Sequence, residues 1–87
     1  MVSKVIKITN PTGLHLEAAG NLCKEAMKYK ALITLQHNND MANAKSVLSV
    51  LGACIKLGDE IELICDGEDE QEALQNLVEL INAGLEY

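Results

Sequence analysis

The chain has 87 residues, 48% of them hydrophobic, with seven lysines, no arginine and a formal net charge of −6. This length supports one hydrophobic core, so we expect a single domain over residues 1–87. The acidic balance excludes a nucleic-acid-binding surface, which needs a basic face. Because the chain shows neither a membrane-spanning apolar run nor a secretory leader, we expect a cytoplasmic protein without membrane insertion. We also expect a monomer.

The first third of the chain predicts a strand, a turn and a helix. Lys4–Ile8 is rich in β-forming residues, and Asn10–Gly13 has strong turn chemistry. The helix is expected over about residues 16–28, with one apolar stripe at i, i+3, i+4, i+7 spacing: Ala19, Leu22, Cys23 and Ala26.

The middle of the chain predicts a hairpin. Ala31–Gln36 is a second β-rich run, and Asn38–Asp40 is a tight-turn cluster that returns the chain through Met41–Asn43. We expect His37, beside that turn, to be an exposed turn residue. Ser46 then caps a short helix, which Gly58 and Asp59 end at the latest.

The last third predicts a strand and a helix. Apolar residues alternate through Ile61, Leu63 and Cys65, which is typical of a strand with one buried face. Asp69 and Glu72 have the spacing of a capping box. They open a helix that ends at Gly84 and has one apolar stripe: Leu74, Leu77, Val78 and Ile81.

Two further residue types have simple interpretations. The three cysteines are odd in number and widely spaced, so we expect small core residues in a reducing compartment rather than a disulfide framework. The acidic residues at 68–72 belong in the first turn of a helix for dipole reasons, so no metal site is expected.

The element order β-α-β-β-α-β-α predicts an α+β fold. Each helix is apolar on one side only, so the helices must cover one face of a sheet. We therefore expect a two-layer open-faced sandwich, with a four-stranded antiparallel sheet and three helices on one face.

His15 is the candidate functional residue because it lies where a turn becomes a helix. The first turn of a helix has backbone N–H groups without helical partners and the positive end of the macrodipole. An anionic group formed on His15 would meet the N–H donors of Leu16 and Glu17. Alternatively, His15 is a polar residue at a helix start with no chemistry.

Three segments resemble HPr, the histidine-containing phosphocarrier family of the bacterial phosphoenolpyruvate:sugar phosphotransferase system. They are Thr12–His15, Asn43–Ser46 before a short apolar helix, and Gly67–Gln71 with Ala73 and Leu74 before the last helix. Each is weak alone, but three in order at the family's spacing cover essentially the whole chain. The resemblance implies an HPr-like fold.

The resemblance also implies a phosphoryl carrier rather than an enzyme with its own turnover. His15 would accept a phosphoryl group from the phosphoenolpyruvate-dependent general enzyme and pass it to a sugar-specific acceptor. Its partners would dock on the apolar residues of the short helix: Val47, Leu48 and Leu51. No cofactor is implied, since phosphoryl transfer depends mainly on positioning and on charge stabilisation.

The chain departs from the family directly after His15. Family members usually continue with Ala-Arg-Pro-Ala, whereas this chain has Leu16, Glu17, Ala18 and Ala19. The usual arginine is thus replaced by a carboxylate, which repels a phosphoryl group. At about 6 Å and an effective dielectric constant near 40, Coulomb's law gives roughly 1.4 kcal/mol per pair of unit charges.

Ser46 carries an alternative function. In many HPr proteins the matching serine is phosphorylated by a dedicated kinase, and the product is a co-regulator of carbon catabolite genes. A phosphate there would lie at a helix N-terminus with Lys45 nearby. The chain would then be a diverged regulatory binding module that acts through Ser46 on a transcription regulator, with weak or no carrier activity.

Overall fold

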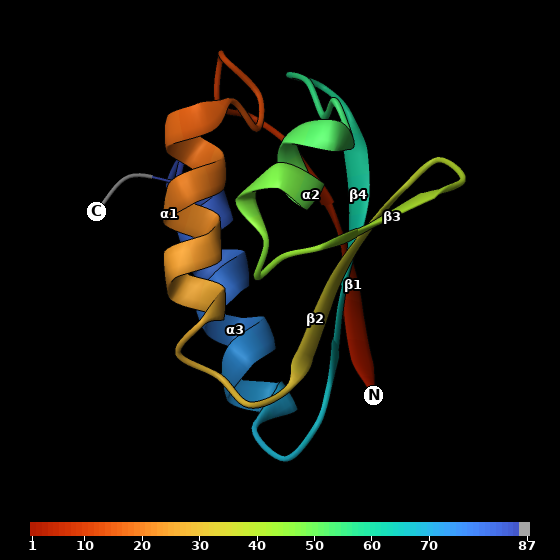
Figure 1. The fold of residues 1–87 in the computed structure, drawn as a ribbon, viewed down its shortest axis with the longest axis vertical. Helices are drawn as coiled ribbons and strands as arrows, with labels where there is room; N and C mark the ends of the chain where they lie inside the picture. The colour runs from red at the N-terminus through yellow and green to blue at the C-terminus, as the bar shows by residue number, and fades with distance from the viewer. Residues whose placement is uncertain (86–87) are drawn as a thin grey trace.

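The computed structural model describes residues 1–85 and confirms the expected element order. The strands are β1 (Val2–Lys7), β2 (Leu32–His37), β3 (Asp40–Asn43) and β4 (Glu60–Asp66). The helices are α1 (Leu16–Ala26), α2 (Val47–Gly52) and α3 (Glu70–Asn82). Figure 1 shows the three helices on one face of the twisted sheet, with the other face uncovered.

The four strands form one antiparallel sheet in the order β1-β4-β2-β3. Leu35 of β2 lies opposite Leu63 of β4 on one side and Ala42 of β3 on the other. In β4 the alternate residues Ile61, Leu63 and Cys65 are buried, as the sequence predicted. The two-layer open-faced sandwich is therefore confirmed.

The core lies between the sheet and the helices. Helix α1 packs against α2 and α3, and its buried face is Ala18, Ala19, Leu22 and Ala26. In α3 the fully buried face is Ala73, Leu77 and Ile81, while Leu74 and Val78 of the predicted stripe are only partly buried. Helix α1 ends at Ala26, slightly before the predicted residue 28.

The start of α2 and the end of α3 agree with the prediction. The Ser46 hydroxyl accepts a hydrogen bond from the Ser49 N–H (3.2 Å), which is a normal N-cap. At Gly84, with a φ of +88°, the Leu85 N–H donates to the Leu80 carbonyl (2.9 Å). This is the Schellman geometry expected of a glycine that ends a helix.

The predicted capping box at the start of α3 is wrong. Asp69 makes no capping hydrogen bond with its own helix. Its carboxylate instead accepts from the Lys30 N–H and the Ala31 N–H, each at 2.9 Å. These hydrogen bonds hold the pKa of Asp69 below its ordinary value, with the Lys30 N–H as the main cause.

The expectation of an exposed turn residue at position 37 is also wrong. The His37 side chain is only 12% exposed, and its Nε2 lies 3.0 Å from the Asp59 Oδ2. Its Nδ1 faces the Ala53 carbonyl oxygen at 3.2 Å. The ring thus connects the end of β2 to the segment between α2 and β4, a contact between distant residues that a local turn pattern does not report.

The cysteines differ in environment. Cys65 is buried as expected, and desolvation raises the pKa of its thiol to about 11. Cys23 is half-buried. Cys54 contradicts the prediction of a core residue because it is exposed, with a φ of +54°, in the turn after α2.

In the part of the chain that the structure describes, no helix is both long enough and apolar enough to cross a membrane.

Candidate functional site

The turn before α1 is held by main-chain contacts to a segment far along the sequence. The Leu14 N–H donates to the Ile55 carbonyl (3.0 Å), and the Leu14 side chain is buried. Gly13 has a φ of +64°, and a Cβ there would lie 2.6 Å from the Ile55 carbonyl oxygen. Only glycine fits this close approach without strain, so the residues that precede His15 are fixed in place.

His15 occupies the N-cap position of α1, as the sequence predicted. Its backbone is extended (φ −77°, ψ −179°), and its carbonyl accepts from the Ala19 N–H (2.7 Å). Its side chain is exposed and makes no capping hydrogen bond. The imidazole is therefore accessible at the positive end of an eleven-residue helix.

Leu16 and Glu17 follow His15 in the first turn of α1. Their N–H groups lie ahead of the first i→i−4 hydrogen bond, which begins at Ala19, so the helix itself gives them no acceptor. The structure thus brings His15 and the two predicted backbone donors together. The Leu16 side chain is 61% exposed beside them.

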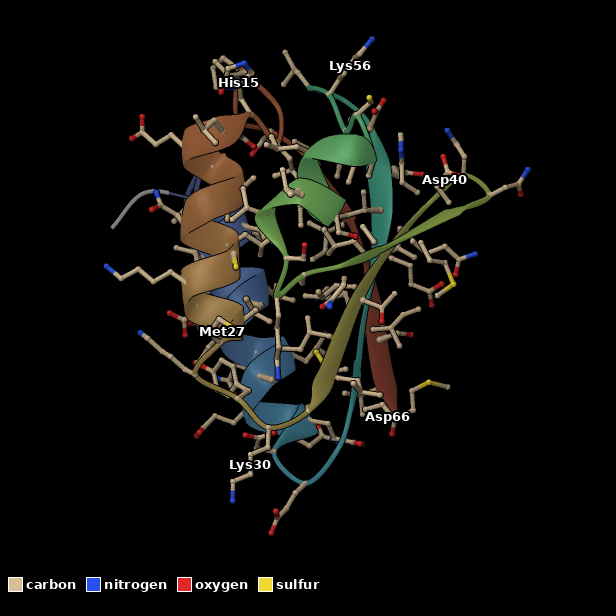
Figure 2. The ribbon with its side chains drawn as sticks, in the orientation of Figure 1. His15, Met27, Lys30, Asp40, Lys56 and Asp66 are labelled. Carbon is tan, nitrogen blue, oxygen red and sulfur yellow. The ribbon has the colours of Figure 1, made fainter. Side chains whose placement is uncertain are left out.

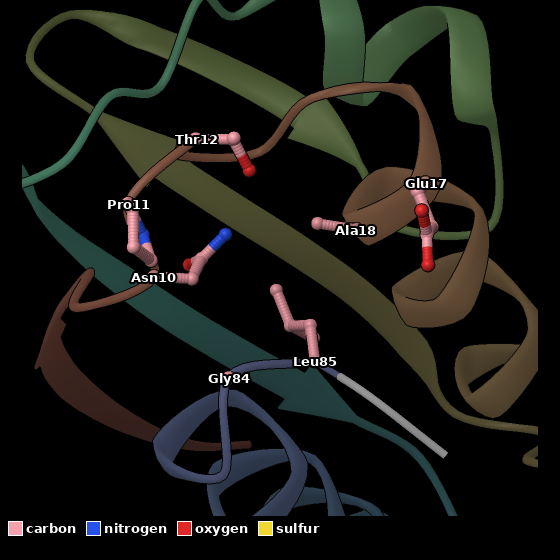
Figure 3. Close-up of a pocket in the computed structure, with 7 residues that line it drawn as sticks. All are labelled: Asn10, Pro11, Thr12, Glu17, Ala18, Gly84 and Leu85. Carbon is pink, nitrogen blue, oxygen red and sulfur yellow. The ribbon is translucent and has the colours of Figure 1, made fainter.

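The Glu17 carboxylate faces a shallow hollow of about 280 Å³ next to the His15 turn. Figure 3 shows Glu17 and Ala18 on one side of this hollow and the turn residues Asn10 and Thr12 on the other. Among residues 1–85, no ion pair neutralises Glu17. The negative charge that the sequence places near His15 is therefore uncompensated by a neighbouring side chain.

The second predicted surface lies on α2, which packs against α1. Leu48 is 82% exposed, whereas Val47 and Leu51 are half-buried and pack on the core. The three residues do not present equal surfaces, because only Leu48 projects into solvent. Ser46 begins the helix, and the hydroxyl of Ser49 binds α2 to β3 by accepting from the Asn43 N–H (2.9 Å).

The Lys45 side chain is not directed toward Ser46, where a phosphate would be added. Its ammonium group donates to the Tyr29 carbonyl (2.6 Å), beyond the end of α1. The expectation that Lys45 would assist a phosphoserine is therefore not met in this structure. Sequence adjacency to Ser46 was misleading, because Lys45 lies in the turn before α2 and its side chain binds the segment after α1.

Sequence reasoning missed the contribution of residues 55–59 to the site. Besides the Ile55 contact, the Ile8 N–H donates to the Asp59 carbonyl and the Gly58 N–H donates to the Ile8 carbonyl, each at 2.9 Å. These bonds join the segment before β4 to the start of the His15 turn. No local signal could have found them, since the partners lie about fifty residues apart.

Comparison with known proteins identifies the family. Residues 2–83 match the family described as PTS HPr component phosphorylation site. The chain belongs to the HPr family of phosphocarrier proteins of the phosphotransferase system. It is 41% identical over 68 residues to the phosphocarrier protein HPr of Mycoplasma capricolum, a match that covers 78% of this chain and 76% of that protein.

Other HPr relatives extend the comparison. The HPr-like protein Crh of Bacillus subtilis is 34% identical over 77 residues, covering 88% of this chain and 91% of Crh. The crystal structure of HPr-C-His from Thermoanaerobacter tengcongensis superimposes with a TM-score of 0.95 at 33% identity, over 98% of this chain and 96% of that one. The expected HPr-like fold is thus confirmed.

Some solved HPr-family structures are dimers. One is an HPr dimer from Thermoanaerobacter tengcongensis (TM-score 0.79, 32% identity), and another is Crh of Bacillus subtilis, described as a swapped, intertwined dimer (0.78, 30%). Each match covers the whole of both chains. The comparisons therefore give no support to the expectation of a monomer.

Proposed function

We propose that this chain carries phosphoryl groups on His15. The group comes from the phosphoenolpyruvate-dependent general enzyme of the sugar phosphotransferase system and passes to a sugar-specific acceptor. The observation that carries the proposal is the exposed, uncapped imidazole at the start of α1. HPr-family membership supports the same chemistry.

In the proposed transfer, a ring nitrogen of His15 uses its lone pair to attack phosphorus. A nitrogen–phosphorus bond forms as the bond between phosphorus and the donor's leaving atom breaks. In a neutral imidazole one ring nitrogen carries no proton, and its lone pair is the nucleophile. The reverse process at the acceptor restores the original imidazole, so the chain is a carrier without net turnover.

The N–H groups of Leu16 and Glu17 would stabilise the phosphoryl oxygens. These N–H groups need not move on phosphorylation, because the helix already holds them at its N-terminus. The Glu17 side chain acts in the opposite direction, since its carboxylate repels the same oxygens. The proposal therefore includes slower or less complete uptake than an arginine at position 17 would allow.

Docking would use the exposed Leu48 side chain, with Val47 and Leu51 supporting it from the core side of α2. One copy of the chain supplies His15, both amides and this surface, so we propose a monomer as the acting species. Light scattering at working concentration tests this, and a stable dimer that transfers phosphate would contradict it.

Incubation with phosphoenolpyruvate and the general enzyme tests the carrier function directly. The intact mass should rise by one acid-labile phosphoryl group. His15→Ala should remove that gain completely, whereas His37→Gln should keep it because His37 lies in a separate structural contact. An unmodified wild-type chain, or a phosphorylated His15→Ala variant, would contradict the proposal.

A second candidate function is a regulatory binding module that acts through Ser46. Its support is the similarity to Crh together with Glu17 beside His15. Ser46 begins α2 two residues before the exposed Leu48, so a phosphate there would change the charge of the proposed docking surface. A purified serine kinase should then modify the wild type but not Ser46→Ala, and a carbon-catabolite transcription regulator should bind only the modified form.

A further inference from the structure

The His15 turn lies against the main chain of Lys56. A Cβ built on Gly13 would lie 2.8 Å from the Lys56 Cα. Two residues of chain span at most about 7 Å, so His15 cannot be far from this contact. Figure 2 shows His15 and Lys56 at the same end of the molecule. The flexible four-carbon stem of Lys56 therefore starts beside the turn that carries His15.

The Lys56 ammonium group is available. The residue is exposed, and its own N–H is held by the Asp59 carboxylate (2.9 Å), which fixes the main chain but leaves the side chain unused. Within residues 1–85, no ion pair or side-chain hydrogen bond engages the Lys56 Nζ. A cation is thus present beside the His15 turn without a partner.

Four of the six other lysines are clearly less well placed. Lys45 is bound to the Tyr29 carbonyl. Lys30 is at the opposite end of the molecule (Figure 2). Lys24 lies eight residues after the start of α1, or about 12 Å along the helix axis. Lys7 alternates with the buried Ile6 and Ile8, so it faces the uncovered side of the sheet.

Helix α1 has no cationic side chain in its first turn, beside a phosphoryl group on His15. The chain contains no arginine, its net charge is −6, and Glu17 adds a negative charge in the first helical turn. Because the transferred oxygens carry about two negative charges, an ammonium group nearby favours the phosphorylated form.

We propose that Lys56 is a phosphate-stabilising residue, whose ammonium group pairs with the phosphoryl oxygens on His15. This rests on the proposed carrier function. It assigns to a residue outside the His15 helix the electrostatic role that an arginine at position 17 would otherwise have. The pairing stabilises the phosphorylated chain itself and does not depend on which protein docks.

The test is the equilibrium constant for phosphoryl exchange between the phosphorylated general enzyme and this chain. That constant depends only on the free phosphorylated and unphosphorylated species, so a residue that merely assists docking cannot change it. Lys56→Met should lower it about tenfold at low ionic strength. Lys30→Met, the same substitution at the opposite end, should leave it unchanged.

Two further measurements sharpen the result. In about 1 M salt, where the screening length falls to about 3 Å, the difference between wild type and Lys56→Met should nearly vanish. In a Glu17→Arg background, Lys56→Met should cost much less, because the arginine supplies the charge. A slower rate with an unchanged equilibrium constant would overturn the proposal and make Lys56 a docking residue. No uptake by the wild type would instead refute the carrier function itself.

Discussion

The two ends of the molecule differ in how far their polar side chains are hydrogen-bonded. At the end opposite His15, the Asp69 carboxylate accepts from the Lys30 and Ala31 N–H groups. Lys45 donates to the Tyr29 carbonyl close by. Each of these contacts connects segments that are distant in sequence, so the polar groups at this end stabilise the fold.

The His15 end has a fixed main chain and three charged or titratable side chains that are not used to hold it. Gly13 and Leu14 are held against Ile55 through backbone contacts. Among the described residues, the side chains of Glu17 and Lys56 form no ion pair, and His15 makes no capping hydrogen bond. The Asn10 amide donates to the Gly13 carbonyl and the Asp59 carboxylate accepts from the Lys56 N–H, so two polar side chains help the backbone to hold this end. The side chains of His15, Glu17 and Lys56 take no part in these contacts, which leaves them available for chemistry.

Gly13→Ala should have the largest effect, because it disrupts the close main-chain packing at the His15 end. The added Cβ would meet the Ile55 carbonyl oxygen and the Lys56 Cα at a positive φ. We expect the free energy of unfolding to fall by about 3 kcal/mol in denaturant titrations. Gly20→Ala is the control, because its Cβ meets nothing and should stabilise the helix by up to about 1 kcal/mol. Equal stability of the two variants would contradict the close contact.

Asp69→Ala should have the next largest effect, at the opposite end. It leaves the N–H groups of Lys30 and Ala31 without their acceptor, so we expect the thermal midpoint at about pH 7 to fall by several degrees. Glu68→Ala, an exposed neighbouring carboxylate, should change it little.

The effect of Asp69→Ala should depend on pH in a defined direction. Because hydrogen bonds lower the folded-state pKa of Asp69, its contribution is present above the ordinary value of about 3.9 and is lost as the pH falls through the lowered value. Thermal midpoints of the wild type and the variant should therefore converge in strong acid. A constant difference across this range would contradict the role of the ionised carboxylate.

Glu17→Arg tests the side-chain charge at the His15 end separately from its backbone. We expect phosphoryl uptake from the general enzyme to become about tenfold faster, since repulsion is replaced by attraction. Glu79→Arg makes the same charge change on α3 and should alter the rate little. The rate is measured by quenching the phosphorylation reaction at successive times and determining the intact mass. An unchanged rate for Glu17→Arg would show that Glu17 does not face the phosphoryl group.

Ser46→Ala should have the smallest effect. Loss of the hydrogen bond from the Ser49 N–H should lower the free energy of unfolding by about 1 kcal/mol and leave uptake at His15 unchanged. Ser3→Ala, which removes an exposed hydroxyl bonded to Glu62, should cost less in the same titration. A large loss of uptake in Ser46→Ala would mean that α2 and His15 act as one unit.

Local patterns in the sequence predicted the fold and the position of His15. Hydrophobic alternation identified β4, helical spacing identified α1, and Ser46 and Gly84 have the chemistry of helix ends. These features depend on residues within about one or two helical turns, which is the range over which a sequence pattern is informative.

Contacts between distant segments could not be predicted. Asp69 has the local chemistry of a cap but binds residues near 30, and His37 lies beside a turn but contacts Asp59. The approach of Lys56 to Gly13 likewise joins two loops more than forty residues apart. Such pairings follow from the completed fold, because tertiary contacts override local preference.

We propose that His15, at the start of α1, receives the phosphoryl group. The most direct measurement compares amide ¹H–¹⁵N spectra before and after phosphorylation by the general enzyme. We expect the Leu16 and Glu17 amide signals to shift most, while the signals of the Lys30 and Ala31 amides, already bound by Asp69, stay in place. Unchanged Leu16 and Glu17 amides in a fully phosphorylated chain would contradict it.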